Sequence, residues 1–438
     1  MYRKISDELL SFIQNNPTAF HVIASVKAIL RERGYEELLE GDTWNLQDKH
    51  SYYVCRNDSS LIAFQISSGC GGFNIVASHT DSPAFKLKEK AELRVGEHYT
   101  KLNTEGYGGM LCSAWLDRPL SVAGRVLIRR DGGIATELVD LAEPVALIPS
   151  VAIHMNRTAN DGYKYNKQVD LLPLFAGAED GKLMDLIADK LNVSPEQILG
   201  SDLYLYPKDQ PAVWGRNREF ISSGRLDNQQ CVYGVLQGFV ESRNEDSINV
   251  MACFDSEEVG SATRQGAAST FLTDVLRRIC LALGKSEEDY LRALASSFML
   301  STDNAHAVHP NHPELTDAEN CVYMNEGVVV KSHAGQRYTS DGISVAALRE
   351  LACRAGVPLQ FFSNRSDMAG GSTLGNIALR HVSVKCADIG LPQLAMHSAY
   401  ETAGVRDTQY LIRLIHTFYN STFTEPAPGT VEITTSNL

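Results

Sequence analysis

The sequence predicts an α/β fold, with a central sheet flanked by helices and interrupted by an inserted β-rich domain. Three observations support this prediction. Near both ends of the chain, apolar stretches of strand length alternate with amphipathic stretches of helical period. Between residues 83 and 221 the pattern changes to short alternating strands separated by turn sequences. Several polar clusters stand where an apolar stretch ends, as expected at the carboxyl edge of an α/β sheet.

The first eighty residues predict helices followed by strands. Residues 1–30 place apolar side chains at helical spacing, with charged and amide side chains between them. The stretches 51–56, 60–66 and 73–81 have strand composition. The last of these is almost entirely apolar until it reaches "HTD", which is typical of a strand covered on both faces.

The middle of the chain is expected to form the inserted domain, over residues 83–221. Turn signals such as "DGG" separate its short strands, and two short helices are expected near its end. The expected strands are 91–95, 124–130 and 133–141, and the expected helices are 183–192 and 194–200.

From Ser222 the α/β rhythm returns, so residues 1–82 and 222–438 are expected to form one domain. Amphipathic stretches indicate helices, and apolar stretches with β-branched or aromatic residues indicate strands. The expected helices are 228–241, 267–284 and 344–356, and the expected strands are 247–254, 358–364 and 381–389.

Composition excludes several classes of partner. The formal charge of −13 and the absence of a basic stripe argue against nucleic acid and against an anionic membrane surface. The longest apolar runs, such as "PVALIPSVAI", are far shorter than a membrane span, and the start does not resemble a signal peptide. Nine cysteines scattered singly are typical of reduced thiols, so we expect a cytoplasmic protein.

Five polar clusters share one context, the end of an apolar stretch. In open α/β sheets such ends converge on one crevice. The clusters contribute His79 and Asp81, Asp227, Glu257 and Glu258, Asp303 and His306, and His397.

Carboxylates gathered in one crevice would repel each other. Two of them about 4 Å apart cost on the order of 4 kcal/mol at an effective dielectric near 20. Two divalent cations would reverse the sign of this energy. Because the ligands would be a mixture of carboxylate oxygens and imidazole nitrogens, we expect zinc, with manganese or cobalt as alternatives.

Spacing within the clusters suggests roles. His79 and Asp81 are two apart on a strand, so they share a face, and Asp81 would orient the imidazole of a metal-binding His79. Of the adjacent Glu257 and Glu258, one would bind metal while the other takes the proton of a metal-activated water, which is the chemistry of amide hydrolysis. The competing interpretations are that Asp81 caps a turn and that Asp227 is a helix N-cap.

At these residues the sequence resembles the aspartyl aminopeptidase family of co-catalytic zinc peptidases. The motifs follow the family's order through essentially the whole chain: "ASHTDSPAFKLK", "GRLDN", "FDSEEVGS", "DNAHAVHPN", "QRYTSD", "SDMAGGSTLG" and "MHSAYETAG". The resemblance implies a mixed central sheet of the zinc-exopeptidase type and two divalent metal ions per subunit. It also implies that Asp227 bridges the metals, that His79 and Asp303 complete one site and Glu258 and His397 the other, and that Glu257 is the general base, with Asp81 assisting catalysis.

The resemblance further implies a tetrahedral homododecamer built from dimers, with residues 83–221 mediating dimerisation. His154 of this inserted domain would complete a neighbouring subunit's active site. Without the resemblance, His154 would be interpreted as a structural or surface histidine, and Lys331 equally well as a solvated lysine that ends a strand. Gly370 and Asn376 depart from the residues common in relatives, so the shape of the specificity pocket stays open. The residues expected to contact substrate are His154, His306, Lys331, Tyr338, Gly371 and Ser372.

The leading functional hypothesis is an aminopeptidase that releases the N-terminal residue of peptides with a free N-terminus, with Asp or Glu the first expectation. Since a yeast relative with similar motifs prefers neutral side chains, neutral or broad specificity is an alternative. A related dinuclear amide hydrolase is a further alternative. A non-catalytic shell or carrier protein ranks third, because such a protein is expected to have lost a ligand or the base.

Overall fold

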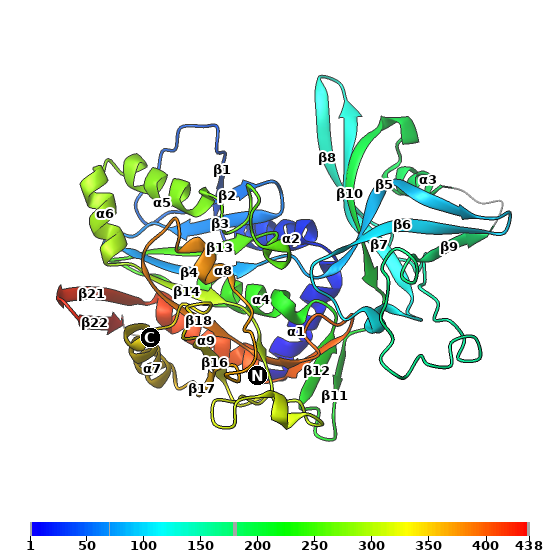
Figure 1. Cartoon of the computed structure of the whole chain (residues 1–438). Coiled ribbons are helices and arrows are strands. Elements are labelled where there is room, and N and C mark those ends of the chain that lie inside the picture. Colours follow the sequence, from blue (N-terminus) through cyan, green and yellow to red (C-terminus); the bar gives the residue numbers. More distant parts are fainter. Residues whose placement is uncertain (1, 70, 178–181, 436–438) are drawn as a thin grey trace.

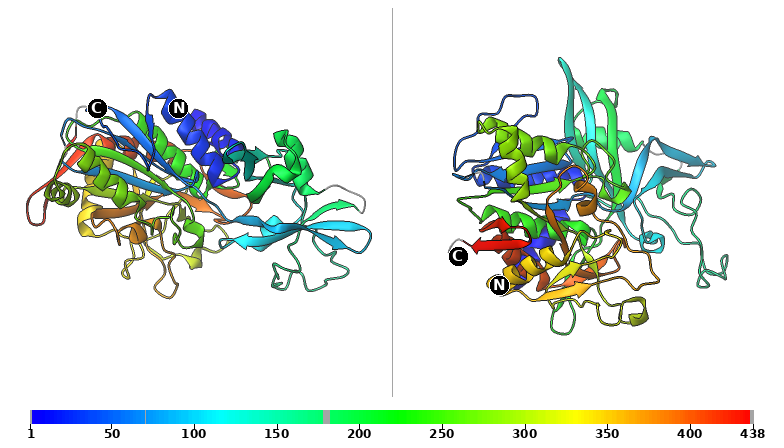
Figure 2. Two further views of the ribbon diagram at one scale, coloured as in Figure 1. Left: turned by 90° about the horizontal axis from the view of Figure 1, so that it is seen from above. Right: turned by 60° about the vertical axis from the view of Figure 1, so that its left-hand side comes forward.

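The computed structural model describes residues 2–69, 71–177 and 182–435. Figures 1 and 2 show an α/β body from which a β-rich unit projects on one side. Both chain termini lie on the body, away from this unit (Figure 1). A mixed central sheet flanked by helices, as expected from the sequence, forms the body.

The described residues of the body contain a nine-stranded sheet in the order β1-β2-β3-β13-β4-β14-β18-β16-β17. Its centre is parallel: β4 pairs in parallel with both β13 and β14, and β14 with β18. Antiparallel pairs of β3 with β13 and of β16 with β18 make the sheet mixed. The strands are β1 (Glu36–Leu38), β2 (Ser51–Arg56), β3 (Ser60–Gln65), β4 (Phe73–His79), β13 (Ile248–Phe254), β14 (Phe298–Thr302), β16 (Val328–Lys331), β17 (Leu359–Phe362) and β18 (Lys385–Gly390).

Helices cover both faces of this sheet because alternate strand residues point to opposite sides. Val76 of β4 packs in one apolar cluster, and its neighbours Ile75 and Ala77 pack in the other. The first cluster lies under α1 (Tyr2–Asn15), α2 (Ala19–Glu32), α4 (Leu226–Val240), α7 (Gly342–Ala355) and α9 (Asp407–Tyr419). The second lies under α5 (Phe271–Ala282), α6 (Glu287–Ala295) and α8 (Leu374–Ala378).

The projecting unit is a six-stranded sheet among the described residues, in the order β8-β7-β10-β5-β6-β9, and all its pairs are antiparallel. It has its own apolar core, which includes Phe85, Trp115 and Leu203. The predicted helix at 194–200 is wrong: a single 3₁₀ turn (Pro195–Gln197) leads directly into a strand. The elements are β5 (Ala84–Val95), β6 (Tyr99–Tyr107), β7 (Leu120–Arg130), β8 (Gly133–Asp140), β9 (Leu174–Gly177), α3 (Leu183–Leu191) and β10 (Ile198–Pro207).

A third sheet joins distant parts of the chain, in the order β11-β12-β20-β19-β15. Its strands are β11 (Ala212–Trp214), β12 (Phe220–Ser223), β15 (Ala305–His306), β19 (Pro392–Leu394) and β20 (Glu401–Gly404), while β21 (Ser421–Ala427) and β22 (Thr430–Thr435) form a separate hairpin. The strand pairing therefore places residues 212–223 with the C-terminal part of the chain. The division at residues 83 and 221 itself stays a prediction.

The parallel strands of the body end at one edge. β13, β4 and β14 are neighbours that run in the same direction, so their carboxyl ends lie side by side. Each end is followed at once by polar side chains: Asp255 after β13, Thr80 after β4 and Asp303 after β14.

Among the residues described, no helix has the length and apolar character that crossing a membrane requires.

Candidate metal centre

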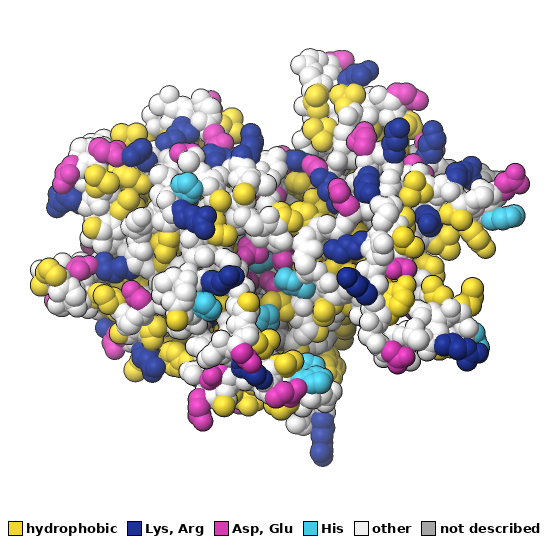
Figure 3. Space-filling model, viewed as in Figure 1, with side chains coloured by type: hydrophobic (Ala, Val, Ile, Leu, Met, Phe, Trp, Pro, Cys, Tyr) yellow, Lys and Arg dark blue, Asp and Glu magenta, His cyan; other side chains and the backbone are white. Residues whose placement is uncertain are grey.

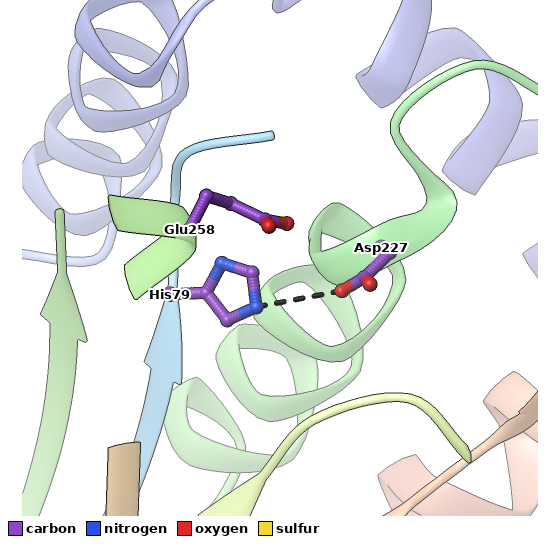
Figure 4. Close-up of side chains that lie close together, drawn as sticks. All are labelled: His79, Asp227 and Glu258. Atoms are coloured by element: carbon purple, nitrogen blue, oxygen red, sulfur yellow. Dashed lines mark ion pairs between the residues drawn. The ribbon is translucent and has the colours of Figure 1, made fainter. Parts of the chain in front are cut away.

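Five acidic and imidazole side chains from separate elements meet at this edge. His79 ends β4, Asp303 follows β14, and Glu258 lies in the 3₁₀ turn Glu257–Val259 after β13. Asp227 stands in the first turn of α4, and His397 lies in the loop between β19 and β20. Figure 4 shows the side chains of His79, Asp227 and Glu258 pointing toward one another.

The two oxygens of Asp227 face different partners. Its Oδ1 lies 3.4 Å from His79 Nε2, and the same nitrogen lies 3.4 Å from Asp303 Oδ1. Its Oδ2 lies 3.4 Å from His397 Nε2, which in turn lies 3.3 Å from Glu258 Oε2. Asp227 thus stands between two groups of ligand-type atoms, one on each of its oxygens.

These residues fit a pair of metal ions. Two ligand atoms on a tetrahedral zinc, each about 2.0–2.2 Å from the ion, lie roughly 3.3–3.5 Å apart. The four separations in the two groups agree with this value. In addition, the buried Asp227 Oδ1 and Glu258 Oε1 accept no hydrogen bond from any described residue. Because a buried carboxylate oxygen that accepts no hydrogen bond is costly, both atoms are suited to a cation.

The electrostatics of the centre favour positive charge. Burial acts to lower the pKa of His79, but the carboxylates of Asp227, Asp303 and Asp81 outweigh it and hold that pKa well above its usual value. Burial raises the pKa of Glu258, and the charge of Asp227 raises it further. Burial also acts against an ionised Asp227, yet His397 and His79 lower the pKa of this carboxyl strongly. Divalent cations would satisfy the same demand for positive charge.

Hydrogen bonding by Asp81 sets the tautomer of His79. His79 Nδ1 lies 3.1 Å from the backbone oxygen of Asp81, and a carbonyl can only accept, so Nδ1 carries a proton. In the neutral ring, Nε2 therefore keeps the lone pair that faces Asp227 and Asp303. The Asp81 carboxylate lies 3.4 Å from the same Nδ1. This geometry suits a metal-binding imidazole oriented by its neighbour.

Asp81 also caps the turn that contains Glu257 and Glu258. The backbone N–H of Glu257 donates to Asp81 Oδ1, and that of Glu258 donates to Oδ2, both at 3.1 Å. The contacts of Asp81 are thus compatible with both interpretations, that it caps a turn and that it orients the imidazole of His79. Asp227 has non-helical backbone angles at the kinked start of α4, and among the described residues no backbone N–H donates to its carboxylate, so the structure gives no support to its interpretation as a helix N-cap.

Glu257 lies beside the two groups without joining either. Among the described residues no hydrogen bond or ion pair of its side chain is recorded, and the side chain is half-buried. Burial raises its pKa to about 7, and although His79 opposes this, the charges of Asp303, Asp81 and Asp227 add to it. A carboxyl group with a pKa near neutrality can both accept and return a proton.

The sequence did not point to Glu401, whose carboxylate binds the backbone of two residues of the centre. This carboxylate is buried at the start of β20, where it accepts hydrogen bonds from Asp227 N at 3.0 Å and from His397 N at 2.7 Å. Burial and the nearby Asp227 charge raise its pKa to about 8. "ETAG" carries no signal for this role, because the contacts arise only when β20 folds beside α4.

We expect the substitution Glu401→Gln to weaken zinc binding by about 10- to 100-fold. Both carboxylate oxygens accept backbone N–H groups, so the amide –NH₂ of Gln would face one of these donors and leave it unpaired. Zinc titration of the metal-free protein measures the change. Equal affinity in the variant and the parent would contradict the supporting role.

Of the predicted substrate residues, Lys331 contacts Asp303, and Tyr338 lies beside Lys331. Lys331 is buried, and its Nζ donates to the backbone oxygen of Asp303 at 2.8 Å and lies 3.5 Å from Asp303 Oδ2. Burial acts to lower the pKa of Lys331, but Asp303 and Asp388 outweigh it and raise that pKa. The ammonium also lies 5.3 Å from the ring of the buried Tyr338. The interpretation of Lys331 as a solvated lysine is therefore wrong.

The other predicted contacts are more open. The His306 side chain is exposed at the end of β15. Partial desolvation by the surrounding protein lowers its pKa, and the charge of Lys331 lowers it further. Gly371 borders open space, and Ser372 Oγ donates to Asn376 Oδ1 at 2.8 Å. His154 is exposed in the segment between β8 and β9, and no recorded bond among the described residues joins it to the centre.

Two hollows adjoin the centre. Figure 3 shows acidic and histidine side chains gathered in a depression in the middle of one face, between the body and the projecting unit. A second cavity, of about 700 Å³ including its open side, lies against Asp81, Asp227 and Glu401, but its lining includes neither His79 nor His397. This cavity therefore borders the centre on the side of Asp81, Asp227 and Glu401.

Comparison with known proteins identifies the family. The family model described as aminopeptidase I zinc metalloprotease (M18) matches residues 12–419. A curated relative from Clostridium acetobutylicum, called probable M18 family aminopeptidase 2, is 45% identical over 427 residues, which cover 95% of this chain and 99% of the relative.

Solved structures agree with this result. The structure of the Ape4 and Nbr1 complex contains a chain that is 33% identical, with a TM-score of 0.92 and coverage of 96% of this chain and 86% of that one. The S. cerevisiae mApe1 dodecamer is 26% identical, with a TM-score of 0.83 and coverage of 95% and 97%. Matching from residue 12 to residue 419, the chain belongs to the M18 family of aminopeptidases, which are zinc metalloproteases.

Proposed function

We propose that this aminopeptidase binds two zinc ions and that the carboxylate of Asp227 would be a ligand of both. His79 and Asp303 would complete one site, and Glu258 and His397 the other. The observation that carries this proposal is the division of partners around Asp227, with one imidazole at 3.4 Å from each of its two oxygens. The oxygen and nitrogen ligand set suits zinc, and manganese or cobalt are the alternatives.

When bound, such ions polarise a scissile carbonyl and lower the pKa of a coordinated water. The residues of the chain supply the proton transfer and the orientation. Glu257, beside the ligands but outside both groups, accepts the proton of the attacking water and returns it to the leaving amine. Asp81 orients both the base and a metal ligand. Its carboxylate accepts a hydrogen bond from the backbone N–H of Glu257 and lies beside the ring of His79.

The substrate of this proposal is a peptide with a free N-terminus. The preference for N-terminal Asp or Glu rests on the resemblance to the aspartyl aminopeptidases, because Lys331, the expected specificity cation, already pairs with Asp303. Neutral or broad specificity remains the alternative. Substrate contacts at His306, Tyr338, Gly371 and Ser372 also belong to the proposal.

A panel of chromogenic aminoacyl substrates tests this function. We expect the highest kcat/KM with Asp or Glu, loss of activity after chelation, and recovery when zinc is added back. Substrates with a blocked N-terminus should not be cleaved. Cleavage of blocked substrates would favour another amide hydrolase, and an undiminished rate after complete metal removal would contradict the proposed chemistry.

We further propose that the chain forms a homododecamer through dimers made by residues 83–221. A dodecamer is described for the similar S. cerevisiae mApe1. The projecting unit also carries exposed apolar side chains, among them Ile134, Met155 and Val169, which suit an interface. Sedimentation should find twelve chains of 48.1 kDa.

We also propose a cytoplasmic location. Cys55, Cys231 and Cys253, among the described cysteines, form no disulfide, as expected in a reducing compartment.

We expect His154→Phe to reduce kcat/KM at least tenfold in the intact oligomer. The family resemblance places this histidine in a neighbouring subunit's active site, and its exposure in the isolated chain leaves it free to reach one. Steady-state kinetics together with sedimentation measure the effect. Unchanged kinetics in an oligomer of unchanged size would contradict the assignment.

A further inference from the structure

Tyr107 connects the six-stranded sheet to the candidate metal centre. It is the last residue of β6, and its hydroxyl donates to Asp81 Oδ2 at 2.8 Å. The other groups on this carboxylate are the backbone N–H groups of Glu257 and Glu258 and the ring of His79, which all belong to the body. Tyr107 is thus the partner of Asp81 that the projecting unit contributes.

The residues after Tyr107 contact Glu258 and His397, the group on the Oδ2 side of Asp227. Gly108 has a φ of 76°, and a Cβ placed on it would lie 3.1 Å from the Cβ of Glu258. Leu111 N donates to the backbone oxygen of His397 at 3.0 Å. The segment Tyr107–Leu111 therefore touches Asp81 and both members of the Glu258–His397 group.

The bond from Tyr107 is of the strong kind. A hydrogen bond to a charged carboxylate is stronger than one between neutral groups, and this bond is partly shielded from water. Burial raises the pKa of the Tyr107 phenol far above its usual value, and the charges of Asp81 and Asp255 raise it further. The phenol therefore keeps its proton, and remains a donor, at neutral pH.

We propose that Tyr107–Leu111 is a positioning segment through which the projecting sheet fixes the geometry of the metal centre in its own chain. Tyr107 acts through Asp81, which holds the His79 ring and the Glu257–Glu258 turn. Leu111 acts through the backbone of His397. This inference rests on the proposed function, because it assigns the segment to the support of metal ligands and base.

The variant Tyr107→Phe tests the proposal, since it removes the hydroxyl and keeps the ring. We expect the metal-free variant to bind zinc about 10- to 100-fold more weakly in a calorimetric titration. The kcat at saturating zinc should fall, while KM should change by less than roughly threefold. In Gly108→Ala, the added Cβ would press on the side chain of Glu258, and the left-handed backbone at this position would be strained. Zinc binding should therefore weaken in this variant too.

Tyr204→Phe is the matched control. The Tyr204 ring packs edge-on against Tyr107 at 5.6 Å, and its hydroxyl makes no recorded bond to Asp81. Its zinc affinity and kcat should equal those of the parent. In an Asp81→Asn background, Tyr107→Phe should lower zinc affinity by less than about twofold further, because both residues act along one path.

Three outcomes would overturn the positioning role. They are parent values of both zinc affinity and kcat in Tyr107→Phe, an equal loss in Tyr204→Phe, or the full loss again in the Asp81→Asn background. A parent protein that binds zinc and cleaves aminoacyl substrates, with a Tyr107→Phe variant that matches it, refutes this inference alone. A parent protein that does neither overturns the proposed function as well.

Discussion

Replacing Glu257 by Gln is expected to lower kcat by about 10²- to 10⁴-fold while the protein still binds two zinc ions. Gln has nearly the same shape as Glu but cannot accept the proton of the attacking water. The side chain of Glu257 makes no recorded hydrogen bond or ion pair among the described residues, so the fold should not change. Steady-state kinetics and metal analysis of the same sample measure both parts of the prediction.

Glu258→Gln is the matched comparison for this test. Glu258 Oε2 lies 3.3 Å from His397 Nε2, so its substitution should lower zinc occupancy as well as activity. A Glu257→Gln variant that cleaves peptides at the parent rate would show that Glu257 is not the base. A variant that loses zinc would instead place Glu257 among the ligands.

Asp227→Asn is expected to weaken zinc binding by about 150- to 5,000-fold and to abolish measurable turnover. Removing one partner from a buried charged set costs about 3–5 kcal/mol, and here the same carboxylate faces both groups. An amide keeps one oxygen but loses the charge and the second acceptor. Calorimetric titration of the metal-free protein measures affinity and stoichiometry together.

Asp303→Asn separates the bridging role from simple loss of charge. Asp303 faces only the His79 side, so its substitution should weaken one ion and leave the other bound. If Asp227→Asn and Asp303→Asn both lose one ion, Asp227 does not bridge. Two ions bound with parent affinity by Asp227→Asn would remove Asp227 from the ligand set.

The general position of the centre could be predicted because it follows from local pattern. β4, β13 and β14 are buried along their length, so their sequences are apolar until the polar residues at the carboxyl ends. That contrast identifies His79, Glu257, Glu258 and Asp303 without any knowledge of tertiary contacts. The helix expected at 228–241 and the strand expected at 247–254 are likewise confirmed by α4 and β13.

Residues whose roles arise from tertiary contacts could not be predicted. Glu401 and Tyr107 stand in ordinary strand sequence, and their carboxylate and hydroxyl gain partners only when distant strands pack together. Lys331 ends an apolar strand, which suits a solvated lysine equally well, and only the fold shows that Asp303 receives its ammonium. The pairing of β12 with β20 joins segments about 180 residues apart and leaves no periodic signal.

The most direct test of the account is anomalous diffraction at the zinc absorption edge from crystals of the zinc-loaded protein. We predict two peaks on opposite sides of the Asp227 carboxylate, one near His79 and Asp303 and the other near Glu258 and His397. A single peak, or peaks that leave either oxygen of Asp227 without a metal contact, would contradict the shared-carboxylate centre.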